Sequence, residues 1–133
     1  MPGSSLFARL MQPLLRHLNV SAPPLAENQG INIDFKHIAM QFTPLNSDEL
    51  LIVASLGCVP AEHHQELAWL LLEQNSFDQP APAINLSVLG NQKTVLLWSR
   101  ERFVNLDSST LIALFERLVD QANETARLIS TQR

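Results

Sequence analysis

Cysteine, long apolar runs and basic charge are all scarce in this sequence. Cys58 is the single cysteine among 133 residues, so no disulfide can form within the chain. A lone cysteine suits a reducing compartment such as the cytosol. The longest apolar stretch, Leu50 to Val59, is far shorter than the ~20 residues that a membrane-spanning helix requires. The N-terminus shows no basic start followed by a continuous apolar segment, as a secretory signal would. We therefore expect a cytoplasmic protein that does not insert into membranes.

Lysine and arginine together number 9 against 13 aspartate and glutamate residues, which gives a net charge of -4. Such an acidic chain repels nucleic-acid phosphates and anionic membrane surfaces, so we expect neither as a partner. The sequence contains no glycine-rich phosphate-binding loop. Apolar residues make up 46% of the chain, a proportion typical of folded proteins, and the length predicts one domain covering residues 1–133.

Hydrophobic periodicity predicts eight elements in the order α-β-β-β-α-β-β-α. Hairpin-joined strands with separated helices indicate an α+β fold, in which a twisted antiparallel sheet is flanked by helices. Pro13 removes a hydrogen bond inside the first helix, so we expect that helix to be bent or broken. The predicted elements are helix 4–18, strands 31–35 and 38–42, a turn at 43–48, strand 50–56, helix 61–74, strands 84–88 and 94–98, and a last helix that Asp107 caps and that runs to about 129.

The predicted helix at 61–74 differs from an ordinary helix lying on a sheet. Its residues from Leu67 to Leu72 are apolar without a polar break, so opposite faces of the helix are both apolar. A chain of this size has little room to enclose such a helix completely. We expect the face with Leu67 and Leu71 to pack on the sheet, and the face of Ala68, Trp69 and Leu72 to form the interface of a homodimer. Burial of the whole helix within the monomer, by the first helix or by loops, is the alternative.

Two groups of residues have the side-chain types that catalysis or metal binding uses. Cys58 lies close in sequence to His63 and His64, and a thiol nucleophile requires a nearby histidine. His63 and Glu66 stand three residues apart and would share a metal ion. However, a cysteine at the end of a buried strand is usually a small hydrophobic group, and no distant cysteine or histidine pair completes a four-ligand zinc site. We therefore expect no enzyme activity, no catalytic residue, no metal and no cofactor.

The apolar segments, in their order along the chain, resemble those of the class I type III secretion chaperones, the family typified by the Tir chaperone. Gly30 to Asp34 is similar to the family's first strand, and Leu50 to Gly57 to its apolar third strand ending in leucine-glycine. Leu70 to Phe77 resembles the leucine-leucine-x-x-asparagine-x-phenylalanine signature that follows the second helix. The segments Val95 to Trp98 and Leu106 to Asp107 follow at the expected places. The last helix has no tryptophan near its end, where many members carry one.

This resemblance implies a bacterial cytosolic homodimer without ATPase activity. Members of the family bind the N-terminal region of a secreted effector, hold it extended and deliver it to the secretion machinery. The implied partners are therefore the effector, a second copy of the chain and the secretion ATPase. Effector segments place apolar residues in surface grooves and add a strand to the edge of the sheet. The residues that we expect to contact an effector lie on the first helix and the first two strands: Leu10, Met11, Leu14, Ile33, Phe35 and Met40.

Two other functions stay open. In the first, the chain is one subunit of a heterodimeric gatekeeper chaperone, which requires a different partner subunit. In the second, it is a small α+β enzyme that uses Cys58 or the His63–Glu66 pair. A homodimer formed by the purified chain alone would favour the effector chaperone over the gatekeeper subunit, and the enzyme would need an exposed, reactive thiol.

Overall fold

The computed structural model describes residues 2–19, 30–35, 38–46, 48–58, 64–75, 78–90 and 93–131. Helices and strands follow one another in the predicted order, with one short 3-10 helix added after the last strand. The elements are α1 (Pro2–His17), β1 (Ile31–Phe35), β2 (Ile38–Leu45), β3 (Glu49–Cys58), α2 (His64–Glu73), β4 (Asn85–Leu89), β5 (Thr94–Arg102), η2 (Phe103–Asn105) and α3 (Ser108–Thr131).

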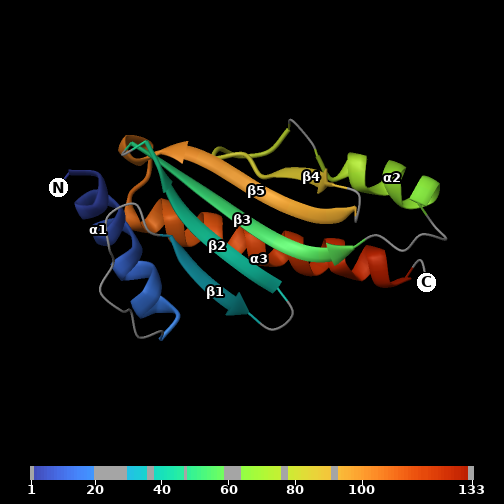
Figure 1. Ribbon diagram of the computed structural model, residues 1–133, viewed down its shortest axis with the longest axis horizontal. Helices are drawn as coiled ribbons and strands as arrows, with labels where there is room; N and C mark the ends of the chain where they lie inside the picture. The colour runs from blue at the N-terminus through green and yellow to red at the C-terminus, as the bar shows by residue number, and fades with distance from the viewer. Residues whose placement is uncertain are drawn as a thin grey trace.

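The strands form one antiparallel sheet in the order β1-β2-β3-β5-β4. β3 is the third of the five strands, so the strand predicted to be central is central. The long helix α3 runs lengthwise behind the sheet, α1 lies at one end of the molecule, and α2 lies at the other end together with β4 (Figure 1). The predicted α+β class and the antiparallel sheet flanked by helices are confirmed.

The hydrophobic core fills the space between the helices and one face of the sheet. Alternate residues of the strands are buried, as period-two patterns require. The rings of Phe42 and Phe115 stack with centroids 6.4 Å apart and join β2 to α3. The opposite face of the sheet is mostly exposed on β1 and β2 and half-buried on β3 and β5. There the Trp98 indole N–H donates to Ser87 Oγ at 2.9 Å. Buried strand positions on the core face include Ile33, Met40, Ile52 and Leu97.

Helix α1 continues from Pro2 to His17 through Pro13, so it is not broken there, and the bend expected at Pro13 stays a prediction. A proline inside a helix costs about 3 kcal/mol, because it lacks the donor and crowds the preceding turn. Met11 and Leu14 lie on either side of it and are fully buried. Each such side chain contributes roughly 1.5–3 kcal/mol when it leaves water. Packing of α1 on the core therefore offsets the local cost of Pro13.

Strand β2 continues to Leu45, so the turn predicted at 43–48 is shorter than expected. Pro44 lies opposite Leu50 of β3 within the sheet. The described pairing of β1 with β2 starts at Ile31 and Phe42, two residues before Pro44. In the part of the chain that the structure describes, no helix is long and apolar enough to cross a membrane.

Candidate protein-binding surfaces

Helix α2 buries one side and exposes the other. Leu67 and Leu71 are buried where the helix packs against α3. We had expected this side of the helix to pack on the sheet instead. Ala68, Trp69 and Leu72, which we name the α2 face, are exposed. Trp69 is 72% exposed and Leu72 is 61% exposed. The alternative in which the monomer buries this helix on all sides is therefore wrong. The role of the α2 face as a dimer interface stays a prediction.

The end of α2 is tied to the edge strand β4. The side-chain oxygen of Asn75 accepts a hydrogen bond from the backbone N–H of Leu86 at 3.0 Å. This bond gives a structural role to the asparagine of the family signature. Near the end of β4, Val88 and Leu89 are exposed. Sequence reasoning missed them as surface residues, although two consecutive apolar residues before the turn glycine Gly90 were a signal that one of them points outward.

The residues expected to contact an effector lie mostly in the core. The side chain of Phe35 falls outside the described residues. Leu10 is 9% exposed and stands at the edge of the core, whereas the other four are more deeply enclosed. The apolar residues that we expected to line a groove thus also pack α1 into the core. Their direct contact with an effector stays a prediction. The buried residues of this set are Leu10, Met11, Leu14, Ile33 and Met40.

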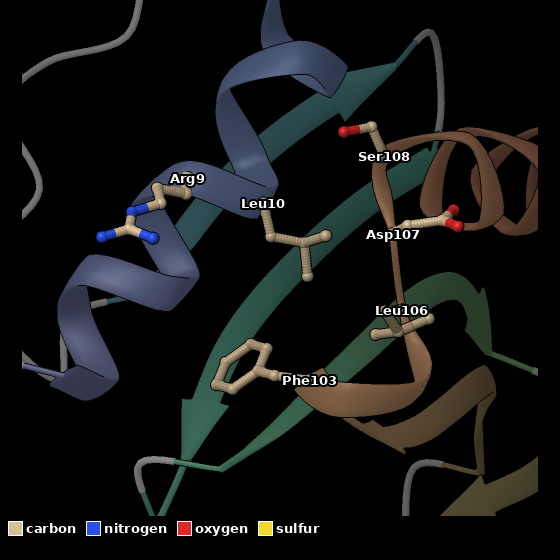
Figure 2. A pocket seen from close by; sticks show the side chains of 6 residues that line it. All are labelled: Arg9, Leu10, Phe103, Leu106, Asp107 and Ser108. Atoms are coloured by element: carbon tan, nitrogen blue, oxygen red, sulfur yellow. The ribbon is translucent and has the colours of Figure 1, made fainter.

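A hollow of about 230 Å³ opens beside Leu10, between α1 and the segment that joins β5 to α3. Leu10, Phe103 and Leu106 point toward one another across it (Figure 2). We name this hollow the Leu10 pocket. Its lining residues come from two distant parts of the sequence, 9–10 and 103–108, so no local motif predicts the pocket. Its wall is completed by Arg9, Asp107 and Ser108.

Two carboxylates at this end of the sheet accept hydrogen bonds from other residues of the chain. Glu49 accepts two hydrogen bonds of 2.9 Å from the Arg100 guanidinium, and these bonds lower the pKa of Glu49. Asp107 caps α3 as predicted, since its carboxylate accepts the backbone N–H of Thr110 at 2.8 Å. That bond is the main reason why the pKa of Asp107 lies below its ordinary value.

Glu101 also accepts hydrogen bonds within the chain, whereas the guanidinium groups of two nearby arginines form none with the described residues. The carboxylate of Glu101 accepts the backbone N–H of Arg102 at 2.8 Å and the side-chain amide of Asn105 at 2.9 Å. The guanidinium groups of Arg9 and Arg102 form neither a hydrogen bond nor an ion pair with any residue that the structure describes. The charge of Arg102 acts on Glu49 at longer range. The wall of the Leu10 pocket thus carries one guanidinium, that of Arg9, and one carboxylate, that of Asp107.

A second hollow of about 470 Å³ lies between the end of α2, the loop at 78–82 and α3. Arg117 in its wall donates to the carbonyl oxygens of Pro80 at 3.0 Å and Pro82 at 3.1 Å, which fastens the loop to α3. The other lining side chains are acidic or amide-bearing, apart from Pro80. Apart from Pro80, no apolar side chain lines this hollow.

Cys58 is exposed, so the expectation of a buried thiol is wrong. Gly57 precedes it with a φ of 94°, and the pairing of β3 with β5 shifts between Ser55 and Cys58, which turns the strand end outward. Its Sγ lies 3.9 Å from Thr94 Oγ1. His63 lies outside the described residues. Among the residues that are described, no three His, Cys, Asp or Glu side chains are grouped to hold a metal ion.

An antiparallel sheet backed by helices, with an exposed apolar helix face at one end and an apolar pocket at the other, defines a protein-binding α+β module. The family model of the Tir chaperone protein (CesT) family matches residues 9–126. The chain belongs to this family, which confirms the resemblance to the class I type III secretion chaperones.

Solved structures share this fold. A chain of the ExoT–SpcS complex from Pseudomonas aeruginosa is 22% identical with a TM-score of 0.70, and the match covers 90% of this chain and 96% of that chain. A chain of the Yersinia pestis type III secretion chaperone SycH, in complex with a stable fragment of YscM2, is 20% identical with a TM-score of 0.69, covering 92% and 98%. A chain of the HopA1–SchA chaperone–effector complex is 13% identical with a TM-score of 0.71, covering 93% and 95%. A comparison with curated protein sequences gave no match.

Proposed function

We propose that this chain is a bacterial cytoplasmic chaperone that binds the N-terminal region of a secreted effector, keeps it soluble and extended, and delivers it to a type III secretion system. Membership of the Tir chaperone protein family is the observation that carries the proposal. Two structures of the same fold support a protein partner, because one is a chaperone–effector complex and the other holds a fragment of a second protein. The chain acts by binding, without catalysis and without a cofactor, and the secretion ATPase receives the loaded chaperone.

The working form is a homodimer joined through the α2 face. Exposed apolar side chains that lie together on a folded protein mark contact surfaces, and Trp69 and Leu72 are both exposed on one side of a helix. A second copy offers the same surface, so a two-fold axis beside α2 buries four such side chains at once. Val88 and Leu89 near the end of β4 are exposed as well, and Asn75 at the end of α2 is hydrogen-bonded to Leu86 of the same strand.

The effector binds away from this interface, along α1 and the first two strands. β1 is an edge strand, and an edge strand offers backbone donors and acceptors to an added extended segment. Leu10 is the candidate for direct contact, because it stands at the rim of the core and lines the Leu10 pocket. Met11, Leu14, Ile33 and Met40 support that surface from below.

Co-expression with the product of the adjacent gene tests the proposal. We expect a stable complex that co-purifies through a tag on the chaperone, and we expect removal of the partner's N-terminal region to abolish it. If the chain purifies only with a different chaperone-like subunit, it belongs to a heterodimeric gatekeeper chaperone. Failure to bind any N-terminal segment of a secreted protein contradicts the proposal.

A further inference from the structure

The outer edge of β4 is covered by amide side chains. β4 ends the sheet order, so no described strand lies on the side that faces away from β5. The Gln79 side chain forms two hydrogen bonds of 2.9 Å with Ile84, the residue before β4: its Nε2 donates to the Ile84 carbonyl and its Oε1 accepts the Ile84 N–H. Asn75 Oδ1 accepts the N–H of Leu86 at 3.0 Å. Residues of paired antiparallel strands exchange both bonds in this way, so Gln79 occupies Ile84 as a neighbouring strand would.

These bonds leave little of the β4 edge free. Backbone groups of alternate residues point to the same side of a strand. Because the Leu86 N–H turns away from β5 toward Asn75, the outward positions are Ile84, Leu86 and Val88. Both backbone groups of Ile84 and the N–H of Leu86 are bonded, and β4 ends at Leu89, directly after Val88. What remains is shorter than the roughly three residues that even a short added strand pairs with.

The two amides are fixed by segments that pack on α3. Arg117 of α3 donates to the carbonyl oxygens of Pro80 and Pro82, which hold the loop just after Gln79. The backbone N–H of Asn75 donates to the Leu72 carbonyl at 3.0 Å, so Asn75 continues the end of α2. That helix lies beside β4 at the same end of the molecule (Figure 1) and packs against α3. The cover over the β4 edge is therefore part of the folded framework.

The opposite edge of the sheet carries no such cover in the described chain. β1 begins the sheet order, and no hydrogen bond joins another described segment to its outer side. Open edges accept extended segments, and proteins block the edges that must not pair. We propose that Gln79 and Asn75 close the β4 edge against strand addition, so that an extended partner segment adds at β1 and not at β4. The closure is a property of this chain alone, and its consequence for an effector rests on the proposed function.

The first test opens the edge. The double variant Asn75→Ala with Gln79→Ala removes both amides. In light scattering coupled to size-exclusion chromatography, it is expected to form an additional species of about twice the wild-type mass that increases with concentration, because two open β4 edges can pair. Asn75→Asp keeps the acceptor for Leu86 and is expected to match the wild type. Glu101→Ala, which removes a carboxylate that accepts two hydrogen bonds away from β4, is the control and is expected to match it too.

A substitution at Val88 tests the location. This side chain is 48% exposed, so Val88→Lys removes no core atoms, and a lysine at an edge opposes pairing. Added to the double variant, it is expected to abolish the additional species. If circular dichroism shows that the double variant does not fold, the two alanine substitutions are measured singly, and at least one is expected to give that species. A folded double variant that keeps the wild-type mass at every concentration would overturn the closure. An additional species that survives Val88→Lys, or that also forms with Glu101→Ala, would do the same.

Hydrogen exchange on the wild-type chain tests the consequence for a partner. In complex with the N-terminal fragment of the adjacent gene's product, the amides of residues 31–35 are expected to exchange about tenfold more slowly than in the chain alone. Those of residues 85–89 are expected to be unchanged. Slower exchange at 85–89 without any change at 31–35 would overturn the inference. Absence of any complex would count against the proposed function alone, and the light-scattering result would still decide the closure.

Discussion

Truncation of Trp69 to alanine is expected to dissociate the dimer without unfolding the chain. An enclosed tryptophan contributes about 150–250 Å² of buried surface. Because the side chain is 72% exposed in the single chain, roughly 150 Å² of it is available to a partner. At about 25 cal/mol per Å², burial of that area contributes about 4 kcal/mol per protomer. If Trp69→Ala removes half of this at each of the two symmetric positions, the dissociation constant rises about 1,000-fold.

Light scattering coupled to size-exclusion chromatography measures this directly over a dilution series. The wild-type chain is expected to run at twice its mass of 14.9 kDa at micromolar concentration, and Trp69→Ala at the single mass. Trp69→Glu is expected to give the same result more completely, since a buried unpaired charge is strongly unfavourable. Val104 is 77% exposed on η2 and provides the matched control, because Val104→Ala should leave the dimer intact. A Trp69→Ala protein that dimerises as tightly as Val104→Ala would refute the choice of the α2 face.

Four further substitutions test the account. Met40→Asp is expected to lower the free energy of unfolding by about 3–5 kcal/mol in urea titrations, because Met40 is 2% exposed and the new charge would be buried without a partner. A folded variant with weakened effector binding would instead restore Met40 as a contact residue. Asn75→Ala leaves the N–H of Leu86 unpaired and should lower the free energy of unfolding by about 1 kcal/mol in the same assay. Cys58→Ser should leave both the thermal melt and effector binding unchanged, since the thiol is exposed, and a folded dimer without function would revive the enzyme alternative. The pKa of Asp107 is lower in the folded chain than its ordinary value of 3.8, so the cap stabilises the fold above that value and loses its effect as the pH falls through the folded pKa. Thermal melts from roughly pH 2 to 6 should therefore show a weaker pH dependence for Asp107→Asn than for the wild type.

Alternation and helical spacing were enough to predict the element order, because each strand and helix has to bury one face. Asp107 was predicted as a cap from residue type and position, and its hydrogen bond to Thr110 confirms it. The errors arose where non-local contacts decide the outcome. Pro13 breaks no helix because its neighbours are buried, and Pro44 lies within β2, paired with Leu50 of β3. Cys58 is exposed because a register shift turns the end of β3 outward.

The candidate surfaces were harder to predict than the fold. Sequence indicated that α2 is apolar on opposite faces, and the structure shows that the side with Trp69 and Leu72 is the exposed one. A core residue and a groove residue have the same composition and spacing, so Met40 could not be assigned to one or the other without its burial. The Leu10 pocket depends on α1 meeting the segment after β5, and no sequence period connects two segments so far apart.

The most direct test of effector chaperoning is the soluble fraction of a secreted partner's N-terminal fragment, expressed with and without this chain. The fragment encoded by the adjacent gene is the one to use, and a chaperone variant carrying Trp69→Glu separates the contribution of dimerisation. The account predicts that the fragment is largely insoluble alone, becomes soluble with the wild-type chain, and elutes in one complex with its dimer. A fragment whose solubility does not change, and which elutes apart from the chain, would contradict the assignment as an effector chaperone.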